Sequence, residues 1–303
     1  MLKPVKIAEN GPTFSRIVFG VMKWGIWGWD YKPAQMLRLI EESIETGVTT
    51  FDHADIYGHY TTEATFGEAM KGQNALRDKM QIITKCGINL ITPNRPDYQI
   101  KSYNTSKEHI LASVENSLRD LHTDYIDLLL VHRPSPLMEA DEVAAAFTSL
   151  KESGKVGAFG VSNFTPAQFD LLNSRFPLTS NQVQASILHL DPFLDGTLDQ
   201  MQQHCLVPTA WSPLGGGMLF NELENPRVQR IRKVAQELSS KYEASGIDQI
   251  LLAWLMRHPT KILPVVGTGR IERLKTAAAA TNIDLSREDW FKLWEASTGE
   301  EVP

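Results

Sequence analysis

Short apolar runs alternate with longer amphipathic segments along most of this chain. The runs are rich in β-branched and aromatic residues, as buried strands are, and the segments between them carry apolar residues at helical spacing. The eight runs that we interpret as strands cover residues 16–20, 48–51, 80–85, 126–131, 156–161, 179–183, 206–211 and 261–266. This alternation, with no second domain boundary, predicts an α/β fold: a (β/α)8 TIM barrel in which residues 1–303 form a single domain.

The predicted helices begin at recognisable signals. Thr105-Ser106-Lys107-Glu108 matches a capping box, and Pro166 stands at the first position of the helix that Thr165 opens. Other helices are predicted over residues 33–46, 62–71, 138–153, 225–241, 247–258 and from 271 onward. An N-terminal hairpin over 5–14 is expected to close one barrel end, and a C-terminal helix over 286–296 is expected to pack outside the barrel.

Two loops leave alternatives open. The stretch from Cys86 to Asn104 is long and polar, and such loops are either lids and binding loops or plain surface insertions. The other loop carries Trp24, Trp27 and Trp29, which either cap the core or form the aromatic wall of a ligand pocket.

Composition narrows the class of protein. The net charge of −6 comes without a basic run, which argues against nucleic acid and anionic membranes as main partners. Only Cys86 and Cys205 are present, so neither a disulfide framework nor a cysteine metal motif is expected. The N-terminus lacks the apolar core of a signal peptide, and no stretch approaches the about 20 apolar residues of a membrane span. We expect a soluble, cytoplasmic protein.

Polar side chains follow three neighbouring strands of the predicted barrel. Asp52 and Tyr57 come after the strand 48–51, Lys85 ends the strand 80–85, and His132 follows 126–131. Each alone is more often structural, as a turn former, a packed aromatic, a surface charge or a core histidine. In a parallel barrel, however, the loops that follow the strands form one active-site face. The sequence therefore predicts that these four side chains meet.

These residues resemble the catalytic tetrad of the aldo-keto reductase superfamily. Phe51-Asp52-His53-Ala54-Asp55-Ile56-Tyr57-Gly58 is similar to the family's F-D-T-A-x-x-Y-G motif. The lysine strand Ile83-Thr84-Lys85 and the histidine strand Leu129-Leu130-Val131-His132-Arg133-Pro134 follow in the family's order. Further similar segments are Gly160-Val161-Ser162-Asn163-Phe164, Asn181-Gln182-Val183-Gln184, Trp211-Ser212-Pro213-Leu214 and Gly267-Thr268-Gly269-Arg270-Ile271-Glu272-Arg273. Among members, the chain looks closest to uncharacterised bacterial oxidoreductases.

The resemblance implies an NADPH-dependent reduction of aldehydes or ketones. Tyr57 would donate the proton, and Lys85 would lower the tyrosine's pKa from about 10 towards neutral. Asp52 would keep Lys85 charged and oriented, and His132 would hydrogen-bond the carbonyl oxygen. The nicotinamide would carry the hydride.

The resemblance also implies a cofactor site. Ser162, Asn163 and Gln182 would bind the nicotinamide carboxamide, Trp211 would stack on its ring, and Thr268 with Arg273 would bind the 2'-phosphate. The full set of implied cofactor-binding residues is Gly20, Met22, Asp52, Ser162, Asn163, Gln182, Trp211, Ser212, Pro213, Leu214, Gly215, Gly267, Thr268 and Arg273. The substrate would contact Trp24, Trp27, Tyr57 and His132. No metal is implied.

The chain departs from the family at the adenosine end of this site. Gly267 stands where many members carry a lysine, and Thr276 and Ala277 stand where an acidic residue and an asparagine often hold the adenine. NADPH remains favoured over NADH, and we expect a monomer or weak oligomer with a small-molecule carbonyl substrate. The alternatives are a cofactor-binding regulatory subunit on the same fold and a barrel isomerase or lyase without nicotinamide.

Overall fold

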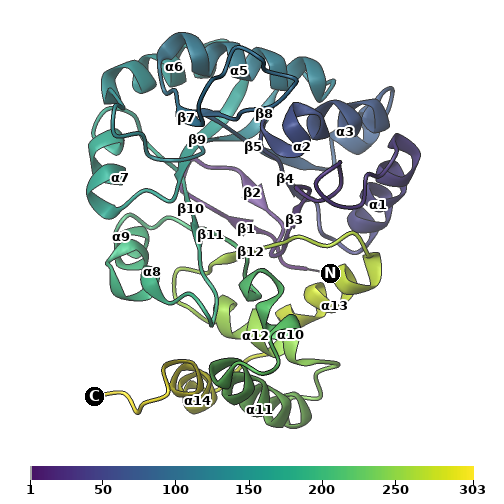
Figure 1. Ribbon diagram of the computed structural model, residues 1–303, viewed down its shortest axis with the longest axis vertical. Helices are drawn as coiled ribbons and strands as arrows, with labels where there is room; N and C mark the ends of the chain where they lie inside the picture. Colours follow the sequence, from purple (N-terminus) through teal and green to yellow (C-terminus); the bar gives the residue numbers. More distant parts are fainter. Residues whose placement is uncertain (1) are drawn as a thin grey trace.

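A closed barrel of parallel strands forms the centre of the protein, in a computed structural model that describes residues 2–303 (Figure 1). The order around the barrel is β10-β11-β12-β3-β4-β5-β8-β9. Its strands are β3 (Val18–Gly20), β4 (Thr50–Asp52), β5 (Gln81–Cys86), β8 (Ile126–Val131), β9 (Val156–Ser162), β10 (Asn181–Gln184), β11 (Thr209–Trp211) and β12 (Leu263–Val266). The predicted (β/α)8 TIM barrel is confirmed, and every predicted run contributes a strand to it.

Helices surround the barrel as an outer ring in Figure 1. They are α1 (Pro33–Glu45), α2 (Tyr57–Tyr60), α3 (Thr62–Met70), α4 (Asn74–Arg77), α5 (Lys107–Asp120), α6 (Ala140–Glu152), α7 (Pro166–Asn173), α8 (Asp191–Leu194), α9 (Thr197–Gln203), α10 (Met218–Asn221), α11 (Pro226–Lys241), α12 (Ile247–Met256), α13 (Ile271–Ala279) and α14 (Arg287–Thr298). Short 3₁₀ turns lie at Gly215–Gly217 and Ala280–Asn282. In the described part of the chain, no helix is long and apolar enough to cross a membrane.

The N-terminal hairpin closes one end of the barrel, as expected. Strands β1 (Val5–Lys6) and β2 (Thr13–Phe14) pair antiparallel. Ile7 and Phe14 are fully buried in the same cluster as Leu128 and Leu263 of the barrel interior. The amide of Val207, at the start of the segment that enters β11, donates to the carbonyl of Ile7 (2.9 Å). The opposite end, where the strands terminate, is therefore the open face.

The C-terminal helix docks outside the barrel through tryptophans. The indoles of Trp254 (α12) and Trp290 (α14) stack with centroids 5.0 Å apart. Each indole N–H donates to the other residue's carbonyl, at 3.1 Å and 3.0 Å. This reciprocal pair fixes α14 to α12, while α14 also lies beside α11 in Figure 1.

Two local details bear on the predicted helix start and the predicted long loop. The helix α5 is capped by Ser106, whose hydroxyl accepts from the amide of His109, and not by the capping box that starts at Thr105. Ser106 has extended backbone angles, which place its hydroxyl over the first turn. The long loop 86–104 has structure of its own, because β6 (Ile88–Asn89) and β7 (Ser102–Tyr103) pair antiparallel within it.

Candidate active site

Lys85 lies at the centre of a buried cluster at the open end of the barrel. Its Nζ is 2.9 Å and 2.8 Å from the two carboxylate oxygens of Asp52, 2.6 Å from the carbonyl oxygen of His53 and 3.3 Å from the hydroxyl of Tyr57. An ammonium has three N–H bonds, so the carboxylate, the carbonyl and the phenol together use its full donor capacity. The lysine is thus held in one position and aimed at the tyrosine.

The charge state of this cluster follows from burial and pairing. Burial opposes the charge on Lys85, but Asp52 and Tyr57 outweigh it and raise the lysine's pKa above its ordinary value. Burial raises the pKa of Tyr57 as well, and the opposing effect of Lys85 is smaller. Lys85 lowers the pKa of Tyr57, as expected, but burial outweighs this effect and leaves the net pKa above its ordinary value. Tyr57 is a protonated phenol at neutral pH, and Lys85 is a cation beside it.

His132 faces the tyrosine from the end of β8. The centroids of the two rings are 6.2 Å apart. Burial, together with the charges of Lys85, Arg133 and Lys101, holds the pKa of His132 well below its usual value, so the imidazole is neutral. Its Nδ1 is buried and has no hydrogen-bond partner in the described part of the chain. Nε2 is not buried in this way, so it is the nitrogen available to a ligand. A neutral imidazole has one N–H to donate.

A left-handed turn positions Tyr57. Gly58, His59 and Tyr60 all have positive φ, at 58°, 58° and 66°. Left-handed backbone is unfavourable for residues with a side chain, so this turn needs support from its surroundings. A Cβ on Gly58 would lie 2.5 Å from the hydroxyl oxygen of Thr62, so only glycine fits there. The Tyr60 hydroxyl closes the turn onto the loop 86–104 by donating to the carbonyl of Ile88 (3.1 Å).

A second group of polar side chains is hydrogen-bonded to the first. Gln182 on β10 donates from its side-chain Nε2 to Oδ1 of Asp52 (2.8 Å), and its main-chain carbonyl accepts from the Ser162 hydroxyl (2.9 Å). Asn163 donates to Ser162 (2.8 Å) and accepts from the indole N–H of Trp211 (3.0 Å). The sequence predicted these residues as ligands of one group, and the structure brings them together as one network.

The barrel order separates the candidate residues into two arcs. Asp52, Lys85 and His132 belong to the neighbouring strands β4, β5 and β8, with Tyr57 following β4. Apart from Asp52, the predicted cofactor-binding residues lie on or just after the five remaining strands β9, β10, β11, β12 and β3, which are also neighbours. The larger, continuous part of the open rim therefore faces the tetrad. An elongated molecule lying along that part would bring one end to Tyr57.

The second arc has the chemistry that a dinucleotide needs. The half-buried Trp211 ring is fixed through Asn163, and one N–H of the Asn163 amide has no partner among residues 2–303, which suits a carboxamide. Gly267 is exposed, and a Cβ there would meet nothing within 4 Å, which leaves open space beside the chain. Arg273 is exposed on the first turn of α13. The residues present fit a nicotinamide dinucleotide.

Other predicted cofactor residues lie along the same rim. Gly20 pairs with Asp52 in the β3–β4 register, and Met22 just beyond it is 40% exposed. The glycine-rich loop after Trp211 contains Gly215 with a φ of 65°. The hydroxyl of Thr268 accepts from the amide of Arg270 (3.1 Å), so this threonine caps its own turn.

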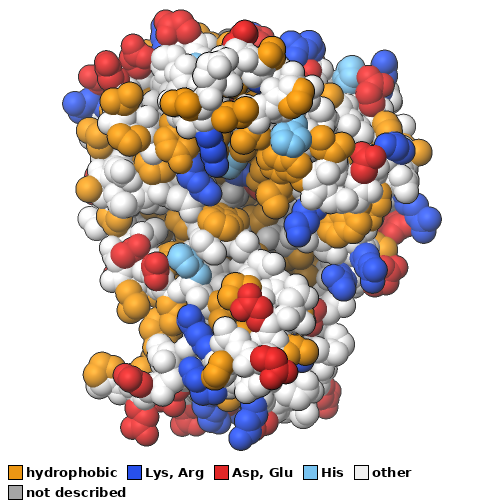
Figure 2. Space-filling model, in the orientation of Figure 1, with side chains coloured by type: hydrophobic (Ala, Val, Ile, Leu, Met, Phe, Trp, Pro, Cys, Tyr) orange, Lys and Arg blue, Asp and Glu red, His pale blue; other side chains and the backbone are white. Residues whose placement is uncertain are grey.

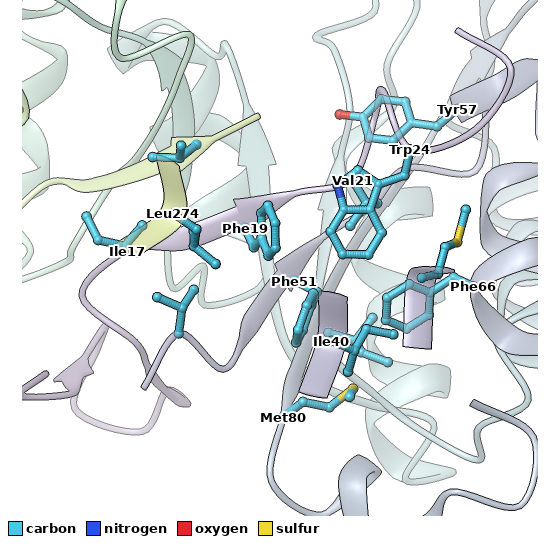
Figure 3. Packing of buried hydrophobic residues seen from close by; sticks show 14 of the residues in the cluster. Ile17, Phe19, Val21, Trp24, Ile40, Phe51, Tyr57, Phe66, Met80 and Leu274 are labelled. Carbon is cyan, nitrogen blue, oxygen red and sulfur yellow. The ribbon is translucent and has the colours of Figure 1, made fainter. Parts of the chain in front are cut away.

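The three tryptophans of the β3–α1 loop differ in how deeply they are buried. Trp24 is fully buried against Phe19, Phe51 and Phe66, and its indole N–H donates to the carbonyl of Thr268 (3.1 Å). Figure 3 shows it inside the cluster, with Tyr57 at the cluster's edge. The prediction that Trp24 contacts substrate is therefore wrong, because apolar packing covers it completely.

Trp27 and Trp29 stay near the surface. The half-buried Trp27 ring lies 6.1 Å from the ring of Tyr57 and 5.3 Å from that of His59, so it borders the candidate site. Trp29 is exposed and stacks on Tyr31, at 5.9 Å between centroids. Only Trp27 has the position expected of a pocket wall beside the tyrosine.

Sequence reasoning missed two charged residues beside the tetrad. Glu63 is buried behind Lys85, where it accepts from the hydroxyls of Thr84 (2.5 Å) and Ser117 (2.8 Å). Burial raises its pKa to about 7. Arg133 follows His132 directly, and its guanidinium lies 5.5 Å above the Trp211 ring. Arg133 could have been found from the sequence, because it directly follows His132. No local sequence feature indicated that Glu63 is buried.

Known proteins resemble this chain over nearly its full length. The Aldo/keto reductase family model matches residues 16–297. Oxidoreductase YdhF of Escherichia coli is 49% identical, with both chains covered completely, and a 6-dehydroglucose reductase of Agrobacterium fabrum is 44% identical over 95% of this chain and 96% of its own. A crystal structure of an aldo-keto reductase from Klebsiella pneumoniae in complex with NADPH superposes with a TM-score of 0.76 at 27% identity, covering 97% and 94% of the two chains. This protein belongs to the aldo/keto reductase family.

Proposed function

We propose that this protein is an NADPH-dependent reductase of aldehydes or ketones, with Asp52, Tyr57, Lys85 and His132 as its catalytic residues. One observation carries the proposal: Lys85 Nζ bridges the Asp52 carboxylate and the Tyr57 hydroxyl at the open end of the barrel. The relatives named as oxidoreductases and the NADPH complex of a structural neighbour support it.

Each tetrad residue has a role that its surroundings support. The protonated Tyr57 donates its hydroxyl proton to the oxygen of the reduced carbonyl, and the Lys85 cation stabilises the tyrosinate that remains. Asp52 keeps the buried lysine charged. The neutral His132 donates a hydrogen bond to the carbonyl oxygen and so stabilises the negative charge that develops on it.

The second arc is proposed to bind the cofactor. The nicotinamide supplies the hydride when it is bound. Trp211 would offer its ring face, Asn163 and Ser162 would hold the carboxamide, and Arg273 would pair with the 2'-phosphate through its planar donors. We retain as predictions that residues 1–303 act as one domain and that the protein is a monomer or weak oligomer.

Two measurements test the proposal. The first is a titration of the purified protein with NADPH and with NADH, followed by quenching of tryptophan fluorescence. We expect tighter binding of NADPH, with the difference lost in Arg273→Ala. The second is NADPH oxidation in the presence of a panel of aldehydes and ketones.

A matched pair of variants tests the acid assignment. We expect Tyr57→Phe to bind NADPH and to lose turnover by a factor of about 10² to 10⁴. Tyr125→Phe removes an exposed phenolic hydroxyl just before β8, at the end of the strand away from His132, and should keep the activity. An active Tyr57→Phe protein would refute the role of Tyr57. Failure to bind either dinucleotide would refute the function itself, whereas binding without turnover would favour a regulatory subunit.

A further inference from the structure

Arg133 crosses the mouth of the candidate active site. It is half-buried, and its Cζ lies 5.5 Å above the ring of Trp211, which ends β11 on the other side of the opening. The phenolic groups of Tyr57 and Tyr103 are near enough to influence its pKa. The guanidinium therefore lies between the tetrad, the loop 86–104 and the proposed cofactor arc.

The donors of this arginine are nearly unused. A guanidinium has five N–H donors, and the one hydrogen bond that Arg133 makes within residues 2–303 is a long bond of 3.4 Å to the carbonyl of His132. No carboxylate of the described chain lies within ion-pair distance of it. Arg77, which is also largely buried, has Asp127 at 3.0 Å and three further acceptors. Arg133 thus has capacity for an acceptor from outside.

Two basic side chains act on the tetrad from the opening. The positive charges of Arg133 and Lys101 both reach the His132 imidazole and lower its pKa. The Asp52 carboxylate is paired with Lys85, and burial raises the pKa of Asp55 well above its usual value. Basic side chains border the hollow in the middle of the face shown in Figure 2, although the whole chain has a net charge of −6.

From this geometry we propose that Arg133 binds an anionic group, a carboxylate or a phosphate, carried by the carbonyl substrate. A planar guanidinium suits the two oxygens of such a group. Because Arg133 and the Tyr57 hydroxyl are close enough to influence each other's pKa, an anionic group held by Arg133 lies near the carbonyl that Tyr57 protonates. The preferred substrates are then short oxo acids or aldehyde phosphates. This inference rests on the proposed reductase function and names its substrate class.

Paired substrates test the anion site in the NADPH-loaded enzyme. We compare kcat/KM for 4-oxobutanoate and butanal, which differ in the carboxylate, and for glyceraldehyde 3-phosphate and glyceraldehyde, which differ in the phosphate. The wild type should prefer the charged member of at least one pair. In Arg133→Met the charged-to-neutral ratio should fall about 10- to 100-fold, mainly through KM. Arg133→Lys should recover part of the preference for the charged substrate, and added salt should reduce the preference of the wild type.

Arg119→Met is the matched control, since it removes one exposed cation from the outer face of α5. It should keep the wild-type ratio in both pairs. The pair with the larger Arg133-dependent preference shows whether the site favours a carboxylate or a phosphate. A ratio unchanged in Arg133→Met, whether activity is kept or falls equally on the charged and neutral members, would overturn the anion site.

A binding measurement separates this inference from the reductase function. Succinate and inorganic phosphate have the anionic groups without an aldehyde, and their binding to the NADPH-loaded protein can be followed by tryptophan fluorescence. Binding that is lost in Arg133→Met, with no turnover of any carbonyl by the wild type, would overturn the reductase and keep the anion site. Turnover of the neutral aldehydes without Arg133-dependent binding or preference would overturn the anion site and keep the reductase.

Discussion

The side chains of Gln182 and Asp52 meet across the barrel, with Gln182 Nε2 2.8 Å from Asp52 Oδ1. Their strands, β10 and β4, occupy opposite positions in the closed order. The bond therefore spans the open end and joins the proposed cofactor arc to the tetrad. The Asp52 carboxylate accepts hydrogen bonds from both Lys85 and Gln182, so its orientation depends on both residues.

Gln182→Leu should lower kcat by about tenfold as well as weaken NADPH binding, because a hydrogen bond to a charged group is worth about 1.5–3 kcal/mol. Steady-state kinetics and a fluorescence titration measure the two effects separately. Gln184→Leu is the control, since Gln184 lies two residues further on the same strand and has no hydrogen bond to Asp52. Weaker cofactor binding with an unchanged kcat would show that the bond does not orient Asp52.

Lys85→Met should slow reduction by a factor of about 10² to 10⁴, because the tyrosinate left after proton transfer loses its neighbouring cation. In the wild type, reduction needs the protonated Tyr57 and is lost as pH rises through the tyrosine's pKa. Burial raises that pKa above its ordinary value of 10.0, so the rate should stay flat through neutral pH and fall only in strong alkali.

Removing Lys85 leaves burial and Asp52 to raise the tyrosine's pKa, so the alkaline fall should move to still higher pH. The profile of kcat/KM against pH measures this shift. Lys79→Met, which removes an exposed lysine just before β5, should leave the profile unchanged. The assignment would be contradicted if the fall in Lys85→Met moved to lower pH.

Glu63 should make the protein less stable as pH rises. Its pKa in the folded state is about 7 against an ordinary 4.5, so the folded state holds the proton more tightly. That contribution is complete below about pH 4.5 and is lost as pH rises through about 7, up to about 3 kcal/mol in the free energy of unfolding. Glu63→Gln keeps the neutral form at every pH.

Urea unfolding should therefore find Glu63→Gln similar to the wild type near about pH 4.5 and more stable than it near about pH 8. Glu68→Gln, on the same helix α3 but with its carboxylate exposed, is the control and should follow the wild type within about 0.5 kcal/mol. A variant that is less stable than the wild type at alkaline pH would contradict the raised pKa of Glu63.

Trp290→Ala should lower the free energy of unfolding by about 2–4 kcal/mol, because it removes a half-buried aromatic side chain that stacks on the buried Trp254. It also removes the indole donor to the Trp254 carbonyl. Urea denaturation measures the loss, and hydrogen exchange should show faster opening of α14. Phe291→Ala, whose side chain is 39% exposed, should cost much less. Equal losses in the two variants would contradict the proposed docking of α14.

Several features of the fold could be predicted because they depend on short-range pattern. Ile126–Val131 is a strand with the predicted bounds, since a continuous apolar run buried on both faces has no other stable place in a barrel. The convergence of Asp52, Lys85 and His132 also followed from sequence order, because equivalent ends of parallel strands share one face. The capping of α5 by Ser106 could not be separated from Thr105, since both hydroxyls precede the helix and only backbone angles decide between them.

The sequence by itself determined which residues form strands, which side chains stand at their ends and to which family the pattern is similar, because each depends on neighbours along the chain. Tertiary structure decided the rest. Trp24 is core and Trp27 borders the site because packing around each differs, not because the residues differ. The direction of the Tyr57 pKa depends on how deeply the phenol is buried, and Arg133 lacks a carboxylate partner because no acidic side chain of the described chain folds back to it. The burial of a side chain, the charges around it and its distance to other residues depend on parts of the chain that are far apart in sequence. A local stretch of sequence therefore cannot determine them.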